Sequence, residues 1–324
     1  MRPMHAPGRA VLRPLQLHNL NPPRSARSPP AVSAPLLFRP SLDAVYGFPH
    51  AKRVTQVVSP YQRIEVWDTP QLGRLFTLDG RPMTSTGDEF IYHECMVHPA
   101  ALAHPSPQAA LVLGGGDGGA ARQLLRHAGI ERIVVAELDA EVVRLTREHL
   151  PEVHGGAFDD PRVELVIGDA AHYVAHAAPA RFDLVVFDLT PPDSPAAGLY
   201  TPTFYQQLKR VMRPIAAVSV HLGSPYFHAA RIARLLDDLR AAFAVVRTMN
   251  TFIPLYGSLW IMATASDTLD PAALAADTLI ERLAARRIGP LMHYDAGTHA
   301  ALFSASRSVR DKLRRCCEIK FWVC

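Results

Sequence analysis

The chain has 324 residues, of which 48% are hydrophobic and 20% charged, so it can bury a sizeable core in one large or two modest domains. This composition excludes a disordered or fibrous chain, and no apolar run reaches the ~18 residues that a membrane helix needs. The 4 cysteines form no Cys-x-x-Cys pair and make no disulfide framework.

The net charge of +4 is distributed unevenly along the chain. Residues 1–42 hold six Arg and no acidic residue, and residues 314–324 add a further +2, which leaves −4 for residues 43–313. The Arg-rich start lacks the interleaved aromatic residues on which nucleic acid bases stack. We therefore expect a soluble, cytoplasmic protein with an acidic core and with neither nucleic acid nor membrane as partner.

Residues 1–42 also contain nine Pro and no sustained periodicity. Such a segment cannot bury enough apolar surface to offset its ordering entropy, so we expect a disordered extension. An organellar targeting segment is the alternative, because the segment is rich in Arg and free of acids. Residues 314–324 match no pattern and are treated as a tail.

Residues 43–104 read as a small antiparallel β domain followed by a linking helix. The expected strands are Val54–Val58, Gln62–Trp67 and Arg74–Leu78. Residues 88–104 show helical periodicity, and their expected apolar face is formed by Phe90, Met96, Val97 and Ala101.

Residues 105–313 alternate strands with helices, which predicts an α/β domain with a doubly wound, mostly parallel sheet. The seven expected strands are Ala110–Leu113, Arg132–Glu137, Val163–Ile167, Phe182–Asp188, Ala216–Leu222, Val246–Ile253 and Leu259–Ser266. The expected helices include Ala120–His127, Ala140–His149, Pro202–Met212 and His228–Phe243. The last two strands are joined by a short loop and should form an antiparallel hairpin.

A glycine-rich turn, residues 114–119, follows the first strand of this domain. Glycine permits a tight turn and close approach of a ligand to the backbone. Glu137 ends the next strand, where a carboxylate can accept hydrogen bonds from a ribose diol. Asp117 within the turn would repel a pyrophosphate and suits a cationic ligand arm. Together these residues indicate an adenosine site, with a purely structural turn as the alternative.

Two further acids follow strands of the same sheet. Asp169 could accept a hydrogen bond from an adenine amino group, or it could simply cap the next helix. Asp188 ends an apolar strand and precedes a Pro-rich loop at the edge where ligands bind in open α/β sheets, so it is the catalytic candidate. The alternative is a second capping or turn residue.

Several ordered motifs give the chain a close resemblance to the spermidine synthase (polyamine aminopropyltransferase) family. They are GGGDGG, AELDAEVV, FDDPRVELVIGDA, FDLVVFDLT and LYTPTFY, with SPYQRIEV, GDEFIYHE and GSPYFH around them. The resemblance covers roughly residues 50–313. It implies a methyltransferase-like seven-stranded sheet behind a small N-terminal β domain, and a homodimer or homotetramer.

The resemblance also implies a reaction: transfer of an aminopropyl group from decarboxylated S-adenosylmethionine to putrescine. The nucleotide is a co-substrate, so no cofactor and no metal are expected. Asp188 matches the family's proton acceptor. The resemblance assigns Gln62, Asp117, Glu137, Asp169 and Ala170 to the nucleotide. It places His93 in the amine channel with Tyr92, and Tyr256 in the amine tunnel; we expect His93 to border the nucleotide as well. We add the loop residues Asp193 and Pro195 as candidates for amine binding.

The amine half departs from the family pattern. Pro191 stands where the family loop has its second Asp, Met83 replaces a Gln, and His221 replaces another Gln. We expect Asp193, two residues beyond Pro191, to supply the missing carboxylate, with an exposed turn residue as the alternative. The departures leave open a transferase acting on a longer polyamine, an S-adenosylmethionine-dependent methyltransferase, and a nucleotide-binding homologue that has lost catalysis.

Overall fold

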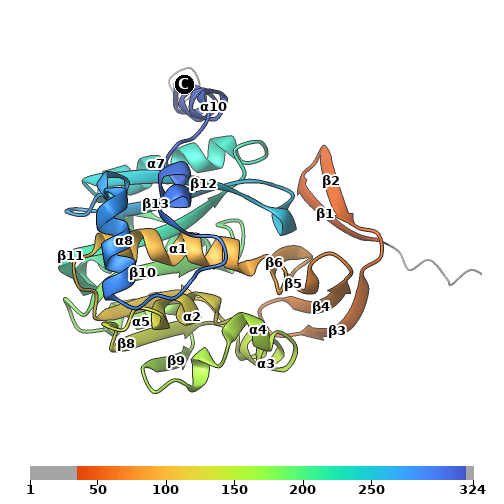
Figure 1. Cartoon of the computed structure of the whole chain (residues 1–324). Coiled ribbons are helices and arrows are strands. Elements are labelled where there is room, and N and C mark those ends of the chain that lie inside the picture. The colour runs from red at the N-terminus through yellow and green to blue at the C-terminus, as the bar shows by residue number, and fades with distance from the viewer. Residues whose placement is uncertain (1–34, 319–324) are drawn as a thin grey trace, which may run out of the picture. The chain divides into compact units, whose positions relative to one another are not determined.

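The computed structural model describes residues 35–318, and its largest element is a seven-stranded sheet (Figure 1). The strand order is β12-β13-β11-β10-β7-β8-β9. The strands are β7 (Ala109–Gly114), β8 (Arg132–Glu137), β9 (Val163–Ile167), β10 (Phe182–Asp188), β11 (Met212–Gly223), β12 (Val245–Ile253) and β13 (Ser258–Ser266). The five strands from β9 to β11 run parallel, and β13 is antiparallel to both of its neighbours. The predicted mostly parallel sheet and its closing hairpin are confirmed.

Helices cover both faces of this sheet because its strands are apolar on both sides. In β7, Ala110 and Val112 face one buried cluster while Leu111 and Leu113 face the other. The first cluster includes residues of α1 (Glu89–Ala103), α2 (Gly119–Leu125), α8 (Ala276–Ala285) and α9 (Ala296–Leu302). The second includes residues of α5 (Ala170–His176), α6 (Pro202–Val211), α7 (Ala229–Ala242) and α10 (Arg307–Glu318). The predicted helices are thus present, with ends shifted by one or two residues.

Two smaller antiparallel sheets precede the large one. The first pairs β1 (Leu36–Ser41) with β2 (Ala44–Phe48), and the second has the order β3-β4-β5-β6. The strands of the second are β3 (Lys52–Val58), β4 (Arg63–Thr69), β5 (Gly73–Leu78) and β6 (Arg81–Ser85). Its inner face packs on α3 (Ala140–His149) and α4 (Pro151–His154) through Ile64, Val66, Leu145 and Val153. This packing sets the small sheet beside the helix that follows β8.

The expectation of a disordered segment through residue 42 is wrong for residues 36–41, which form β1. The side chains of Leu36 and Phe38 are buried against the facing strand, and the ring of Phe38 lies 5.4 Å from that of Tyr46. The strand pairing becomes irregular after Phe38, where Pro40 cannot donate a ladder hydrogen bond. The rest of the predicted extension, residues 1–34, lies outside the described residues.

Three other details differ from the sequence expectations. Helix α1 has no single apolar face, because residues on all its sides are buried between the sheet and α2 or α8. Strand β6 was missed because it contains Pro82, which is tolerated at the edge of a sheet. The predicted tail begins inside a helix, since α10 continues to Glu318, and residues 319–324 lie outside the described part of the chain. None of the helices formed by residues 35–318 is long and apolar enough to span a bilayer.

Glu94 in α1 joins this helix to the segment before α9. The carboxylate is buried and accepts the backbone N–H groups of Met292, His293 and Tyr294 at 2.8–2.9 Å. A Glu94→Gln variant keeps the shape of the side chain but replaces one carboxylate oxygen by an NH₂ group. This group can only donate, and it faces a backbone N–H that has then lost its acceptor. We expect the variant's free energy of unfolding to fall by about 2–4 kcal/mol, since buried groups lose their partners. Urea denaturation measures this change.

The matched control is Glu148→Gln, on the surface of α3. Glu148 is 56% exposed and pairs only with neighbouring surface groups, so its removal should change the free energy of unfolding by less than about 0.5 kcal/mol. Equal stability of the two variants would show that the Glu94 carboxylate does not hold the segment.

Candidate active site

The carboxyl ends of the parallel strands open into a cavity of about 580 Å³. Its walls also include residues of both small sheets and of α1, α6 and α7. Every residue predicted from the sequence lines this one cavity: Gln62, Tyr92, His93, Asp117, Glu137, Asp169, Ala170, Asp188, Asp193, Pro195 and Tyr256. The structure therefore brings the predicted nucleotide and amine residues together in one cavity.

Glu137 lies where β8 ends, beside the glycine turn. Its two oxygens accept the backbone N–H groups of Gly116 at 3.1 Å and Asp139 at 2.9 Å. Burial raises the pKa of Glu137 to about 7, and the neighbouring carboxylates add to this shift. A Cβ at Gly116 would lie 2.9 Å from the Glu137 side chain, so only glycine permits this approach. The Glu137 carboxylate therefore lies at the cavity wall, where it can accept hydrogen bonds from a pair of ligand hydroxyl groups.

The other residues predicted at the nucleotide end also have structural partners. The Gln62 side-chain amide donates to Asp139 at 3.1 Å, and Ser59 donates to the same carboxylate at 2.6 Å. Asp169 caps α5 by accepting the backbone N–H of Ala171 at 2.7 Å. The capping alternative for Asp169 is therefore confirmed, and the residue still lines the cavity next to Ala170.

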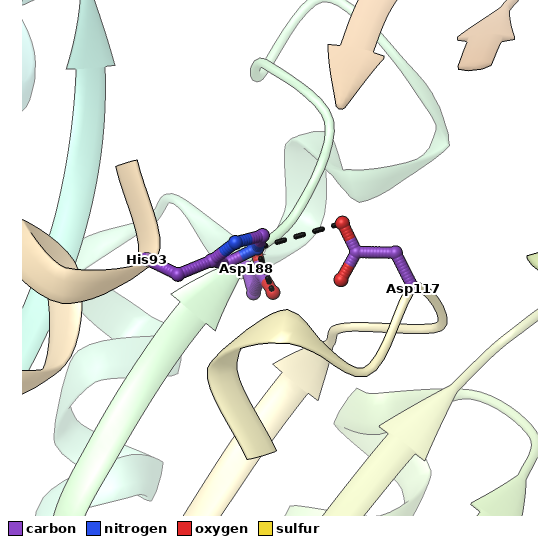
Figure 2. A group of neighbouring side chains, drawn as sticks. All are labelled: His93, Asp117 and Asp188. Atoms are coloured by element: carbon purple, nitrogen blue, oxygen red, sulfur yellow. Dashed lines mark ion pairs between the residues drawn. The ribbon is translucent and has the colours of Figure 1, made fainter. Parts of the chain in front are cut away.

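His93 stands between two carboxylates at the centre of the cavity. Its Nε2 lies 3.5 Å from Asp117 Oδ2 and 3.8 Å from Asp188 Oδ2. Figure 2 draws these ion pairs as dashed lines. His93 comes from α1, Asp117 from the turn after β7, and Asp188 from the end of β10. Both His93 Nε2 and Asp188 Oδ2 are buried without a hydrogen-bond partner. These two atoms are available to a ligand.

The protonation states at this centre follow from burial and mutual charge. Burial opposes a charge on His93, but Asp117, Glu89 and Asp188 together raise the His93 pKa well above its usual value. The resulting imidazolium holds the pKa of Asp117 below its usual range despite burial. Burial and the negative charge of Asp117 raise the pKa of Asp188 to about 7, against the effect of His93. Asp188 is thus the weaker acid of the pair and the better proton acceptor.

Sequence reasoning missed the residues that orient His93. The Nδ1–H of His93 donates to Glu89 at 2.7 Å, one helical turn earlier, and Glu89 also accepts from Arg122 of α2. Arg122 in turn donates to the carbonyl of Glu152 at 2.7 Å. The spacing of Glu89 and His93 by four residues was a usable signal, because such residues meet on one helix face. Nothing in the sequence pointed to Arg122.

Beyond Asp188 the cavity wall is aromatic. The ring of Tyr256 lies 4.3 Å from that of Trp260 and 6.3 Å from that of Tyr92, and His221 stacks on Trp260 at 6.1 Å. Burial lowers the pKa of His221 to about 4, so this ring is neutral and donates from Nε2 to the Leu189 carbonyl at 2.6 Å. Met83 contributes its carbonyl, which accepts from the Tyr256 hydroxyl at 2.8 Å. The wall suits an aliphatic chain.

The loop after Asp188 leads to a group of charges at the far side of the cavity. Asp193 accepts from Arg81 of β6 at 2.8 Å and lies 3.4 Å from Arg231 of α7. Although partial burial opposes its charge, the two guanidinium groups hold the pKa of Asp193 below its usual value. Asp193 is therefore already paired with two cations, and its expected part in amine binding stays a prediction.

The central cluster also has donor atoms of the kinds that bind metals. One atom each of His93, Asp117 and Asp188 lie within 4.8 Å of one another. A metal would need the neutral imidazole, whereas the ion pairs with both carboxylates favour the protonated ring. The protonated ring therefore disfavours a metal at this cluster.

Comparison with known proteins agrees with the fold. Residues 89–273 match the model of the spermine/spermidine synthase domain. The chain is 46% identical over 255 residues to a polyamine aminopropyltransferase of Nitrosomonas europaea, covering 79% of this chain and 78% of the relative. It is 39% identical to polyamine aminopropyltransferase 2 of Hyperthermus butylicus, over 78% of this chain and 83% of that protein.

Solved structures show the same likeness. A spermidine synthase in complex with the transition state analogue AdoDATO superposes with a TM-score of 0.76 at 29% identity, over 84% of this chain and 91% of the other. The spermidine synthase of Thermotoga maritima gives a TM-score of 0.75 at 29% identity, over 84% and 90% of the two chains. The similarity therefore spans the N-terminal sheets as well as the seven-stranded sheet.

Proposed function

The chain belongs to the spermine/spermidine synthase family and is a polyamine aminopropyltransferase, and on this premise we propose that it transfers the aminopropyl group of decarboxylated S-adenosylmethionine to a short primary amine. Putrescine, which would give spermidine and methylthioadenosine, is the reference acceptor. The observation that carries the proposal is the position of Asp188, a buried carboxylate of raised pKa beside the cationic-arm candidate Asp117.

The reaction is an in-line displacement at the carbon next to the sulfonium. The acceptor nitrogen forms a bond to this carbon, the carbon–sulfur bond breaks, and its electron pair neutralises the sulfur. The leaving group needs no acid, because it departs as a neutral thioether. The difficulty is the nucleophile, since a primary amine has a pKa near ~10 and arrives protonated at neutral pH. One proton must leave the ammonium before the nitrogen can attack.

The proposal gives ten of the predicted cavity residues a part in this scheme. Asp188 takes the proton from the acceptor ammonium, and alignment of the nitrogen with the carbon supplies much of the remaining acceleration. Asp117 holds the ammonium of the aminopropyl arm, with His93 nearby. Glu137 accepts from the ribose hydroxyls, while Gln62, Asp169 and Ala170 border the rest of the nucleoside. Tyr92, Tyr256 and Pro195 enclose the aliphatic part of the acceptor.

The test is an incubation of the full chain with decarboxylated or intact S-adenosylmethionine and a set of amines. Release of methylthioadenosine together with an aminopropylated amine supports the proposal. S-adenosylhomocysteine formed from intact S-adenosylmethionine would instead identify a methyltransferase. Tight nucleotide binding without any product would identify an inactive homologue, and either result would overturn the proposal. Cytoplasmic location and a homodimer or homotetramer stay predictions.

The pH dependence of the reaction should reflect the protonation of Asp188. With its pKa raised to about 7, Asp188 is increasingly protonated below this pH and cannot accept the ammonium proton. We expect kcat/KM for the acceptor to fall about tenfold per pH unit below pH ~7 and to be level from there to about pH 9. Steady-state rates between pH 5.5 and 9.5 in buffers of constant ionic strength measure the profile. A continuous rise through pH 9, without a plateau, would mean that the enzyme selects the neutral amine from solution.

A further inference from the structure

The turn between β12 and β13 carries Tyr256 into the cavity wall. It contains a single 3₁₀ turn, η3 (Pro254–Tyr256), which is closed by a backbone hydrogen bond from the Gly257 N–H to the Pro254 carbonyl at 3.0 Å. So short a helix has little stability of its own, because one hydrogen bond does not offset the entropy lost in fixing a first turn. The position of Tyr256 therefore depends on contacts that reach the turn from other parts of the chain.

Two side chains from the N-terminal part of the chain hold Leu255, the residue before Tyr256. The carboxylate of Asp88, which directly precedes α1, accepts the Leu255 N–H through Oδ2 at 2.7 Å. The hydroxyl of Tyr46 in β2 donates to the Leu255 carbonyl at 3.1 Å. These partners lie 167 and 209 residues away along the chain. Both polar groups of the Leu255 backbone are thus fixed by tertiary contacts.

Asp88 acts on the turn and not on the cavity directly. The residue is 2% exposed, and it does not belong to the described residues that line the cavity. Its other oxygen, Oδ1, accepts from the Ser85 hydroxyl at 2.5 Å, so both oxygens have protein partners. Burial raises the pKa of Asp88, and the two hydrogen bonds oppose this shift. A buried carboxylate is costly unless it is hydrogen-bonded, and one of the contacts that satisfy it also fixes the turn.

From these contacts we propose that Asp88 is a positioning residue for the amine acceptor. With Tyr46 it fixes the backbone of Leu255, and this sets the adjacent Tyr256 ring against Trp260, with 4.3 Å between the ring centres. The inference rests on the proposed aminopropyl transfer, in which Tyr256 encloses the aliphatic part of the acceptor, and it adds a residue that does not touch the amine. The nucleotide residues and the proton acceptor belong to other elements. Loss of the Asp88 contact should therefore weaken acceptor binding more than it slows the chemical step.

The comparison of Asp88→Ala with Asp88→Asn tests this role. Alanine removes the acceptor for the Leu255 N–H, whereas asparagine keeps one acceptor oxygen for it and can donate its NH₂ group to the Ser85 hydroxyl. With decarboxylated S-adenosylmethionine as donor, we expect KM for the amine that the parent uses best to rise about tenfold in Asp88→Ala, with kcat within about threefold of the parent. Asp88→Asn should recover most of this loss, because the loss follows the hydrogen bond and not the charge. Affinity for methylthioadenosine, measured by calorimetry, should be the same in all three proteins.

A second variant and a spectroscopic measurement test the same contact from its other side. Tyr46→Phe keeps the ring but removes the donor to the Leu255 carbonyl, so it should raise the same KM about threefold. Tryptophan emission without substrate should shift in Asp88→Ala and return in Asp88→Asn, since the Tyr256 ring packs on Trp260. Asp277→Ala, at an exposed position of α8, is the matched control and should change neither KM nor emission.

Failure of this inference differs from failure of the proposed function. An unchanged KM in Asp88→Ala, no recovery in Asp88→Asn, or a loss of methylthioadenosine affinity as large as the loss of acceptor affinity overturns the inference and leaves aminopropyl transfer standing. Should Asp88→Ala not fold, an unchanged KM in Tyr46→Phe overturns it alone. Absence of methylthioadenosine release by the parent chain with every amine overturns the proposed function itself.

Discussion

Replacement of Asp188 by Asn is expected to lower kcat about 10³-fold, which is the range of a positioned general base. The asparagine amide has the shape of the carboxylate but cannot take a proton from the acceptor ammonium. The carboxylate ends β10 and lines the cavity, and its Oδ2 is buried without a hydrogen-bond partner. Single-turnover measurement of methylthioadenosine formation follows the chemical step directly.

Two controls separate this loss from a loss of binding or of folding. Affinity for methylthioadenosine, measured by calorimetry, should change little in Asp188→Asn, since Glu137 and the glycine turn are untouched. Asp277→Asn, at an exposed position of α8, removes the same charge and should keep full activity. If Asp188→Asn keeps its rate within about threefold of the parent, Asp188 is not the base.

The second large effect is expected from Gly119→Ala, at the start of α2. A Cβ at this position would lie 2.6 Å from Nε2 of His93 and closer still to Cε1 and Nδ1. The imidazole is buried and held by Glu89, so it must leave its place between Asp117 and Asp188. We expect kcat/KM to fall about 100-fold, because misplacements of about 1 Å at a reacting centre have effects of this size.

The melting temperature distinguishes displacement of the His93 imidazole from a general loss of folding. Gly119 is a helical residue, and at helical positions alanine is intrinsically favoured over glycine by up to about 1 kcal/mol. A loss of activity without a fall in Tm therefore indicates that the imidazole has moved. The control is Gly289→Ala, where a Cβ meets no atom within 4 Å. Unchanged kcat/KM in Gly119→Ala would show that the position of His93 is unimportant to the reaction.

The sequence predicted the parts of this site that depend on strand order. Glu137, Asp169 and Asp188 each follow a strand of a parallel sheet, and parallel strands present their carboxyl ends at one edge. Their meeting in one cavity therefore follows from local patterns. Strands β8 and β10 were recognisable as short apolar runs, because both of their faces are buried.

Other features depend on contacts that no local pattern records. Arg81 and Arg231 reach Asp193 from positions 112 and 38 residues away, so their effect on that carboxylate was invisible in the sequence. Strand β1 was hidden by Pro40 and by the Pro-rich composition of residues 1–42. Its order comes from packing of Phe38 on Tyr46 and Phe48, which the local sequence does not record. The all-round burial of α1 likewise arises from tertiary packing, which overrides helix periodicity.

The imidazolium that His93 places between Asp117 and Asp188 has a consequence for the end of each catalytic cycle. On the proposed reaction, the nucleotide enters with a sulfonium and an ammonium and departs as methylthioadenosine without either. The ammonium leaves with the aminopropylated product, and the imidazolium of His93 remains as the counter-charge of the two carboxylates. Methylthioadenosine, which carries no positive charge, should therefore bind less tightly than the sulfonium donor and should be released readily.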